Sequence, residues 1–248
     1  MAIFMSWTIG GAIVSFILSV IAIVANFVDM GTFGDFMINY SYIFHFVTAL
    51  GMVTLFMFVD FNTISPGAND NLTGTYAAVC ALRMLDMAGV DFENTEVCAM
   101  ITDGEEAGLR GCKSWAKNHY DEYVNSGVET VVLCVDTLTD REYLRVYNKD
   151  MTGTVKNNQQ FSQLVMDASK DAGHDDIELS SVFFGSSDAA AFSQAGITAT
   201  CLAAMDPRPA DYYHNRRDTA DRLVPETIKT GFDVIISTIL NFDEKGLN

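Results

Sequence analysis

Several short segments of this sequence carry side chains that could hold a metal ion. Asp70 lies in a loop rich in Pro, Gly and Asn, Glu105 and Glu106 stand side by side after Gly104, and His214 follows a tyrosine. Carboxylate oxygens and a neutral imidazole are suitable ligands for a divalent ion such as zinc. A further carboxylate beside the ion can take a proton from water that the ion activates. These residue types therefore point to metal-dependent hydrolysis.

The predicted elements place these acids at comparable positions. Asp70 precedes a helical pattern, the pair Glu105 and Glu106 follows a predicted strand, and Asp136 closes another. Sites in open α/β sheets form at the carboxyl ends of the strands. We therefore expect the acidic residues to converge at one edge of a sheet.

Beyond residue 61, apolar runs suited to buried strands alternate with amphipathic helical patterns. The pattern predicts an α/β fold, a three-layer sandwich with a mostly parallel central sheet. Its predicted strands are Thr95–Thr102, Glu129–Leu138, Glu178–Phe184 and Ile197–Met205. Its predicted helices are Leu72–Ala88, Gly108–His119, Asn158–Ala172, Asp188–Ala195 and a last one that begins at Pro225.

The order and spacing of these motifs from Ser65 to Leu247 resemble the clan MH zinc aminopeptidases. That group includes secreted bacterial aminopeptidases and glutamate carboxypeptidase, and glutaminyl cyclases are its relatives. The resemblance implies a site with two zinc ions, in which Asp70 bridges both. Glu106 and Asp136 would each bind one ion, and His214 would complete the second site.

The same resemblance assigns the catalytic groups. Glu105 would be the general base, and Tyr213 would steady the oxyanion that forms during the reaction. Gly104 permits a turn that aims the two neighbouring glutamates differently. The family also has a cis peptide after the bridging aspartate, here Asp70-Asn71.

Some polar residues near these motifs have two interpretations. Asp188 follows two serines and could cap a helix, and Ala189 replaces the histidine of the family's Ser-Asp-His motif. Asp103 and Asp218 could orient the metal ligands or could be solvated. The sequon that begins at Asn71 is better interpreted as part of the metal loop than as a glycosylation site.

One family ligand is missing from the sequence. Members of the family carry His-x-Asp on the strand before the bridging aspartate, and Phe58 stands where that histidine would be. Either the first zinc site has been lost, or the His-x-Asp strand lies upstream of Met1. We favour the second explanation, in which the chain is an N-terminally incomplete version of a larger protein that lacks the opening strands.

Residues 1–60 differ in composition from the rest of the chain. They contain no Lys or Arg, and residues 1–28 and 36–59 carry no charge at all. About 20 apolar residues in a helix span a hydrocarbon core of ~30 Å. We therefore predict a two-helix transmembrane hairpin over residues 1–60, a catalytic domain over residues 61–248, and a membrane location with two spans.

Two alternatives exist for these apolar runs. A cleavable signal peptide is disfavoured, because the first run has no basic residue before it and is long. Val53–Asp60 could instead be a buried strand of the catalytic sheet, although the length of the run favours the membrane. His45, within the second run, is expected to be a packing histidine that has a polar partner.

The net charge and the cysteines limit the kinds of partner and site that the chain is expected to have. The net charge is −17, which excludes nucleic acid as an expected partner, because phosphates would be repelled. The five cysteines, without CxxC spacing, are expected to be reduced, buried thiols. His119 and His174 are expected to be surface residues.

These observations predict a membrane-anchored, metal-dependent exopeptidase of the aminopeptidase type. It would hydrolyse N-terminal peptide bonds with zinc-activated water, and its partners would be peptide substrates and, through residues 1–60, a lipid bilayer. Two alternatives stay open. One is a single-zinc acyl transferase similar to glutaminyl cyclase that uses Asp70, Glu106 and His214, and the other is a catalytically decayed binding module.

Overall fold

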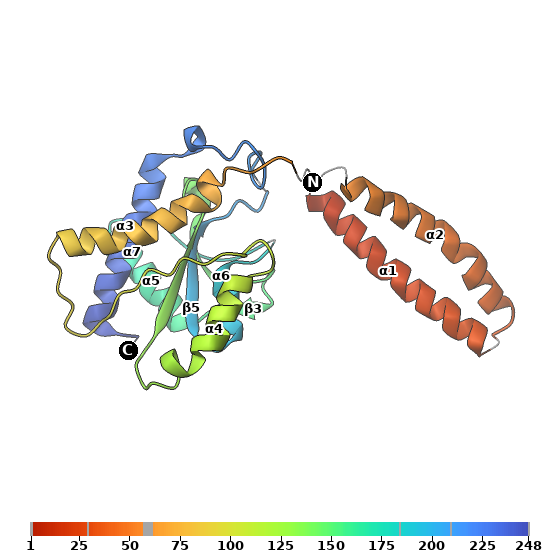
Figure 1. The fold of residues 1–248 in the computed structure, drawn as a ribbon, viewed down its shortest axis with the longest axis horizontal. Helices are drawn as coiled ribbons and strands as arrows, with labels where there is room; N and C mark the ends of the chain where they lie inside the picture. Colours follow the sequence, from red (N-terminus) through yellow and green to blue (C-terminus); the bar gives the residue numbers. More distant parts are fainter. Residues whose placement is uncertain (1, 29, 57–61, 184, 209, 248) are drawn as a thin grey trace. The chain divides into compact units, whose positions relative to one another are not determined.

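The computed structural model describes residues 2–28, 30–56, 62–183, 185–208 and 210–247. The chain divides into two compact units, residues 1–64 and residues 65–248 (Figure 1). The boundary that the sequence predicts, between residues 60 and 61, lies outside the described residues.

The first unit is a pair of helices at the two uncharged runs. Helix α1 (Ala2–Phe27) and helix α2 (Thr32–Phe56) lie side by side and are joined by a short turn. Residues 53–56 are therefore helical, which rules out a strand that begins at Val53, and residues 57–60 lie outside the described structure. Within the described residues, no helix combines the length and the apolar character needed to cross a membrane. The transmembrane part of the prediction is therefore not supported.

His45 connects the two helices through its imidazole ring. Its Nδ1 contacts the Ser15 hydroxyl, and its Nε2 lies 3.1 Å from the Ser19 hydroxyl. Both serines belong to α1, so the ring is half-buried between polar partners. This arrangement agrees with the expected packing role.

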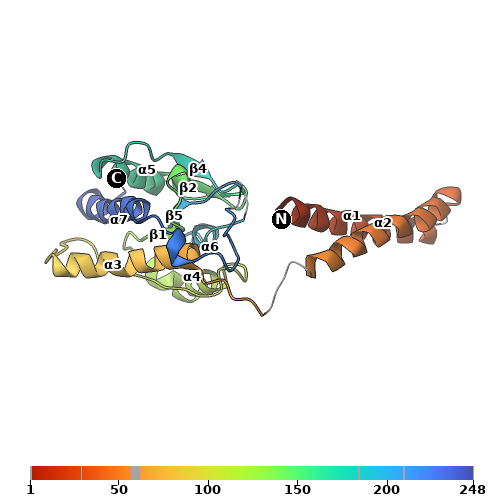
Figure 2. The same cartoon turned by 90° about the horizontal axis from the view of Figure 1, so that it is seen from above.

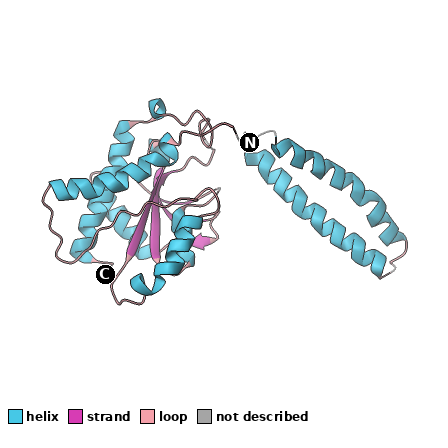
Figure 3. Cartoon of the chain, viewed as in Figure 1, coloured by secondary structure: helices cyan, strands magenta, loops and turns pink. Residues whose placement is uncertain are grey.

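The second unit is built around a sheet, whose strands are drawn in magenta in Figure 3. The strands follow the order β1-β5-β2, and β3 and β4 both pair with β2. The strands are β1 (Val131–Asp136), β2 (Leu144–Asp150), β3 (Val155–Lys156), β4 (Leu179–Ser181) and β5 (Thr198–Ala204). Strand β1 pairs with β5 in parallel, and β2 pairs with β4 in parallel. Strand β2 runs antiparallel to both β5 and β3. The sheet is mixed, and the prediction of a mostly parallel sheet is wrong because β2 and β4 run in the direction opposite to β1 and β5.

Helices cover both faces of this sheet and make three layers (Figure 2). One face carries α3 (Gly74–Met87), α5 (Gln159–Asp171) and α7 (Pro225–Lys245), and the other carries α4 (Arg110–Tyr123) and α6 (Asp188–Gln194). Side chains alternate between the faces along each strand. Accordingly, Leu144 and Val146 enter the core under α5 and α7, whereas Tyr147 enters the core under α4 and α6.

The ends of these helices follow local sequence signals. α7 begins with Pro225. Proline has no backbone N–H, so it leaves no donor without a partner in the first turn of the helix. α5 is capped by the Asn158 side chain, which accepts a hydrogen bond from the Phe161 N–H at 2.9 Å. Gly89, two residues after the end of α3, takes φ +66°, a conformation that glycine adopts without steric cost.

The strand predicted over Thr95–Thr102 is absent. This segment forms no strand pairing with any described residue. An apolar run becomes a strand only if a neighbouring backbone takes up its hydrogen bonds. Conversely, β2 and β3 were not predicted, because Arg145, Asn148 and Lys149 interrupt the apolar pattern of β2.

The cysteines are only partly as expected. All five are free thiols, and Cys112 and Cys201 are buried and Cys134 is half-buried. Cys80 and Cys98 are exposed, which corrects the prediction that all five are buried. Cys80 lies on the outer side of α3, and Cys98 lies in the segment that does not join the sheet.

Candidate metal centre

The Asp70 loop is a tight turn held against the core by a buried carboxylate. The turn spans Ala68–Thr73 before α3, and the Asp70-Asn71 peptide bond is cis, as the family resemblance implied. The carboxylate of Asp218 accepts the backbone N–H of Asn69 at 2.8 Å and that of Asp70 at 2.9 Å. Asp218 is fully buried. Of its two sequence interpretations, the orienting one is the one observed.

Asn71, the residue after Asp70, connects the loop to the end of β1 through hydrogen bonds. Its side chain donates to the Val135 carbonyl at 2.9 Å and accepts the Thr137 N–H at 3.2 Å. A Cβ atom added at Gly74 would lie 2.2 Å from the Val135 carbonyl oxygen, so only glycine permits this approach. The Asn71 amide thus belongs to the metal loop.

Three of the predicted metal ligands meet in space. Potential ligand atoms of Asp70, Glu106 and His214 all lie within 4.8 Å of one another. The Nε2 atom of His214 is 3.2 Å from Asp70 Oδ2 and 2.9 Å from Glu106 Oε1. These side chains come from three segments far apart in the sequence. Two carboxylates and one imidazole converge on a single point, as ligands of a divalent ion do.

The fourth predicted ligand, Asp136, is half-buried beside this group. Its Oδ1 atom is inaccessible to solvent and has no hydrogen-bond partner within the described structure. Burial, followed by the charges of Asp70 and Glu105, raises the pKa of Asp136 well above its ordinary value. A buried carboxylate oxygen without a partner is costly, and a cation would remove that cost. The residues present therefore fit a divalent metal ion.

Glu105 differs from its neighbour Glu106 in its electrostatic surroundings. Burial, together with the charges of Glu106, Asp188 and Asp70, raises the pKa of Glu105 to about 7. The hydrogen bond from His214 instead lowers the pKa of Glu106. The two adjacent carboxylates are thus prepared for different tasks, one to exchange protons near neutral pH and the other to stay ionised.

Tyr213 and His214 lie together over the cluster. Their rings stack with centroids 3.7 Å apart and planes inclined by 21°. His214 has φ +54°, a left-handed conformation that few non-glycine residues adopt and that is frequent at functional sites. Burial and the charges of the surrounding acids raise the pKa of the Tyr213 phenol, so it stays protonated and able to donate a hydrogen bond.

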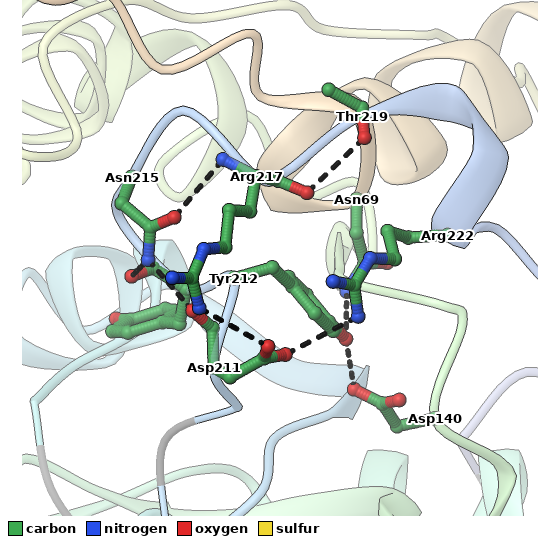
Figure 4. A network of polar contacts seen from close by, with 9 residues as sticks. Asn69, Asp140, Asp211, Tyr212, Asn215, Arg217, Thr219 and Arg222 are labelled. Carbon is green, nitrogen blue, oxygen red and sulfur yellow. Dashed lines mark hydrogen bonds and ion pairs between the residues drawn. The ribbon is translucent and has the colours of Figure 1, made fainter.

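A polar network beside the cluster holds the His214 loop to the Asp70 loop (Figure 4). The buried Tyr212 hydroxyl donates to Asp140 Oδ2 and accepts from Asn69 Nδ2 at 3.3 Å. Asn69 Oδ1 in turn accepts the Leu138 N–H at 3.0 Å. Sequence reasoning missed these residues, although Tyr212 directly precedes Tyr213 and His214. A cavity of about 70 Å³ is lined by this network and by the metal cluster.

The remaining candidates fall outside the cluster. Asp188 is the first residue of α6, accepts from the Thr102 hydroxyl at 3.3 Å, and raises the pKa of Glu105 through its charge. Asp103 is exposed, consistent with the solvated alternative. His119 and His174 contact Glu122 and Asp233 away from the site. Phe58, at the position of the missing ligand, lies outside the described residues.

Metal binding at this cluster should become tighter as pH rises. Burial alone would lower the pKa of His214, but its hydrogen bonds to Asp70 and Glu106 raise that pKa to about 10 in the metal-free protein. His214 is therefore protonated at neutral pH and must lose its proton to ligate a metal. Each proton released makes apparent affinity rise about tenfold per pH unit. Chelator competition with zinc at pH 6, 7 and 8 measures this slope, and an affinity independent of pH would contradict it.

Comparison with solved structures shows the same fold. The aminopeptidase from Aneurinibacillus sp. strain AM-1 matches with a TM-score of 0.59 at 22% identity, over 71% of this chain and 39% of that protein. A glutaminyl cyclase from an Acidobacteriales bacterium matches with a TM-score of 0.54 at 16% identity, over 73% of this chain and 63% of that protein.

The sequence comparisons agree. Aminopeptidase YwaD of Bacillus subtilis (strain 168) is 27% identical over 194 residues, which cover 71% of this chain. The chain spans only 37% of the length of that relative. The model of peptidase family M28 matches residues 52–239, which is most of the chain. The chain therefore belongs to peptidase family M28.

Proposed function

We propose that residues 65–248 form a metal-dependent exopeptidase domain that removes N-terminal residues from peptides. The observation that carries this proposal is the convergence of Asp70, Glu106 and His214 beside the unpartnered carboxylate oxygen of Asp136. The family and the relatives named as aminopeptidases support the same reaction class. Zinc is the expected ion, and cobalt or manganese suit the same ligands.

The chain's own residues can be given roles in this reaction. Divalent metal bound by Asp70, Glu106, Asp136 and His214 would supply Lewis acidity and lower the pKa of water. Glu105 would accept a proton from the attacking water and return it to the leaving amine. The Tyr213 hydroxyl would donate a hydrogen bond to the developing oxyanion. Closely spaced acids around the cavity favour the positively charged N-terminus of a peptide.

Hydrolysis of unblocked peptides tests the proposal directly. We expect the zinc-loaded chain to release the N-terminal residue of a leucyl peptide, and we expect the N-acetylated peptide to remain intact. Mass spectrometry identifies the products. Cleavage within the peptide, or no cleavage at any zinc concentration, would refute the assignment.

Glutaminyl cyclisation is the second candidate. The specific observation in its favour is that the described residues gather one group of three ligands, which suits a single ion. A cyclase would convert an N-terminal glutamine peptide to its pyroglutamyl form with loss of ammonia. Mass spectrometry of a Gln-Leu peptide distinguishes this product from cleavage. A decayed binding module would do neither, and the retention of Glu105 beside the ligands argues against decay.

The two metal positions that the family resemblance implies should bind zinc with unequal affinity. Without a histidine in the position of Phe58, we expect one ion to bind firmly and a second to bind weakly, with correspondingly low hydrolysis. Elemental analysis after dialysis, followed by calorimetric zinc titration, measures both. Two firmly bound ions together with high activity would show that an unidentified residue supplies the missing ligand.

We also propose that residues 1–60 attach the chain to a lipid bilayer as a hairpin. The proposal rests on the absence of charge in residues 1–28 and 36–59 and on exposed apolar side chains. Phe16, Ile23 and Phe27 of α1 are each more than two-thirds exposed. Such apolar surface is seldom left in water.

Thiol labelling in sealed vesicles tests the hairpin. The exposed native Cys80 reports the side of the catalytic domain, and Gly31→Cys in the turn between α1 and α2 reports the other end. We expect an impermeant maleimide to label the two positions from opposite sides. Labelling from the same side, together with a chain that stays in solution without detergent, would refute the proposal.

A further inference from the structure

A second cavity adjoins the candidate metal centre along the edge of the sheet. It measures about 230 Å³ and is lined by residues from β2, β4 and the segment after β5. Met205 and Asp206 line both this cavity and the one at the metal cluster. A ligand at the metal cluster would therefore lie next to the second cavity.

The register of the sheet places Arg145 in line with a metal ligand. Asp136 of β1 lies opposite Ala203 of β5, and Ala203 lies opposite Arg145 of β2. Residues directly opposite one another project from the same face of a sheet. Adjacent strands are about 4.8 Å apart, so Arg145 stands about 10 Å from Asp136 on the same face.

The guanidinium of Arg145 has unused hydrogen-bonding capacity. It donates to its neighbouring Leu144 carbonyl at 2.8 Å and forms no ion pair with any described residue. An arginine side chain has five N–H donors in a planar fork that matches a carboxylate. Among the described residues that line the two cavities, Arg145 is the one Arg or Lys side chain.

The acidic residues of this cavity are placed so that they leave Arg145 available. Asp206 accepts the Arg208 N–H at 2.6 Å and forms no ion pair with Arg145. Glu142 is exposed and is not paired with Arg145. The Ser180 and Ser181 side chains supply neutral hydroxyl groups to the same cavity.

We infer that Arg145 binds a carboxylate on the leaving-group side of a peptide whose scissile bond lies at the metal cluster. This inference rests on the proposed function and adds a substrate class to it. An extended peptide advances about 3.3–3.6 Å per residue. A span of about 10 Å corresponds to about three residues. The reach of the arginine side chain shortens it to one or two residues beyond the scissile bond. The preferred substrates are therefore dipeptides and tripeptides with a free C-terminal carboxylate or an acidic side chain near that end.

Paired substrates test the role of Arg145. The substrates are Leu-Ala-Ala with a free C-terminus, the same peptide as its C-terminal amide, and Leu-Ala-Glu amide. We expect Arg145→Gln to lower kcat/KM for the free acid about 10- to 100-fold, the range for a charge-assisted pair, and to leave the Leu-Ala-Ala amide unchanged. A parallel loss with Leu-Ala-Glu amide identifies a side-chain carboxylate as a ligand, whereas a loss with the free acid alone identifies the C-terminus.

Control variants separate this role from a structural one. Arg145→Lys keeps the charge and should recover part of the preference for the free acid. Arg83→Gln, on the exposed side of α3, should leave kcat/KM unchanged for both the free acid and the amide. An equal loss for the free acid and the amide in Arg145→Gln would indicate a structural role and overturn the inference, as would no loss for either.

A binding measurement decides the inference even if the chain hydrolyses no peptide. Calorimetry with the zinc-loaded full chain compares the product Ala-Ala with its amide. We expect tighter binding of the acid and loss of that difference in Arg145→Gln. Absence of hydrolysis with this difference present would reject the peptidase function alone. Equal binding of acid and amide by the wild-type chain would reject the carboxylate site.

Discussion

Replacing Glu105 with glutamine should abolish peptide hydrolysis and leave the bound metal almost unchanged. Glutamine keeps the size of the side chain but cannot accept a proton from water. General-base catalysis typically contributes 10²- to 10⁴-fold to the rate, and the loss should fall in that range. Glu105 lies outside the group formed by Asp70, Glu106 and His214, so the affinity for zinc should persist. Peptidase assays combined with elemental analysis measure both quantities.

The neighbouring residue supplies the matched control. Glu106→Gln makes the same chemical change one position along the chain, but it removes an oxygen that lies 2.9 Å from His214 Nε2. We expect this variant to lose metal as well as activity. If Glu105→Gln loses its metal, or if it turns over at the wild-type rate, the division of roles between the two glutamates is wrong.

Replacing Asp218 with alanine should have the second large effect, on both metal affinity and stability. The Asp218 carboxylate is fully buried and accepts the backbone N–H groups of Asn69 and Asp70. Leaving a buried donor without a partner costs about 1–3 kcal/mol. Two such donors lie in the loop that carries Asp70, so the loop should lose its fixed geometry. Loss of groups that orient metal ligands typically weakens metal binding 10- to 100-fold.

Thermal unfolding with and without zinc, together with zinc titration, measures these effects. Asp218→Asn keeps one side-chain oxygen as an acceptor and should be intermediate. Asp221→Ala removes an exposed acid from the same loop and should behave as the wild type. If Asp218→Ala destabilises the fold but binds zinc with unchanged affinity, Asp218 supports the fold without orienting the metal loop.

Most of the helices of residues 65–248 could be predicted from local signals. Apolar spacing indicated α3, α4, α5 and α6, and Pro225 marked the start of α7, because capping and periodicity depend on residues within one or two turns. The metal residues were also recognisable, since Asp70, Glu106 and His214 stand in motifs whose residue types suit a metal. The sequence showed which side chains could bind an ion.

The partners of each backbone segment were decided by the tertiary structure. β2 lies antiparallel to β5 and gives a mixed sheet, and Thr95–Thr102 has no described strand to pair with. Direction and pairing depend on segments far apart in the sequence, so a local apolar pattern does not specify them. The same reason applies to Asp218 and Tyr212. Their hydrogen bonds to the Asp70 loop cross more than 140 residues, and only the fold brings those donors and acceptors together.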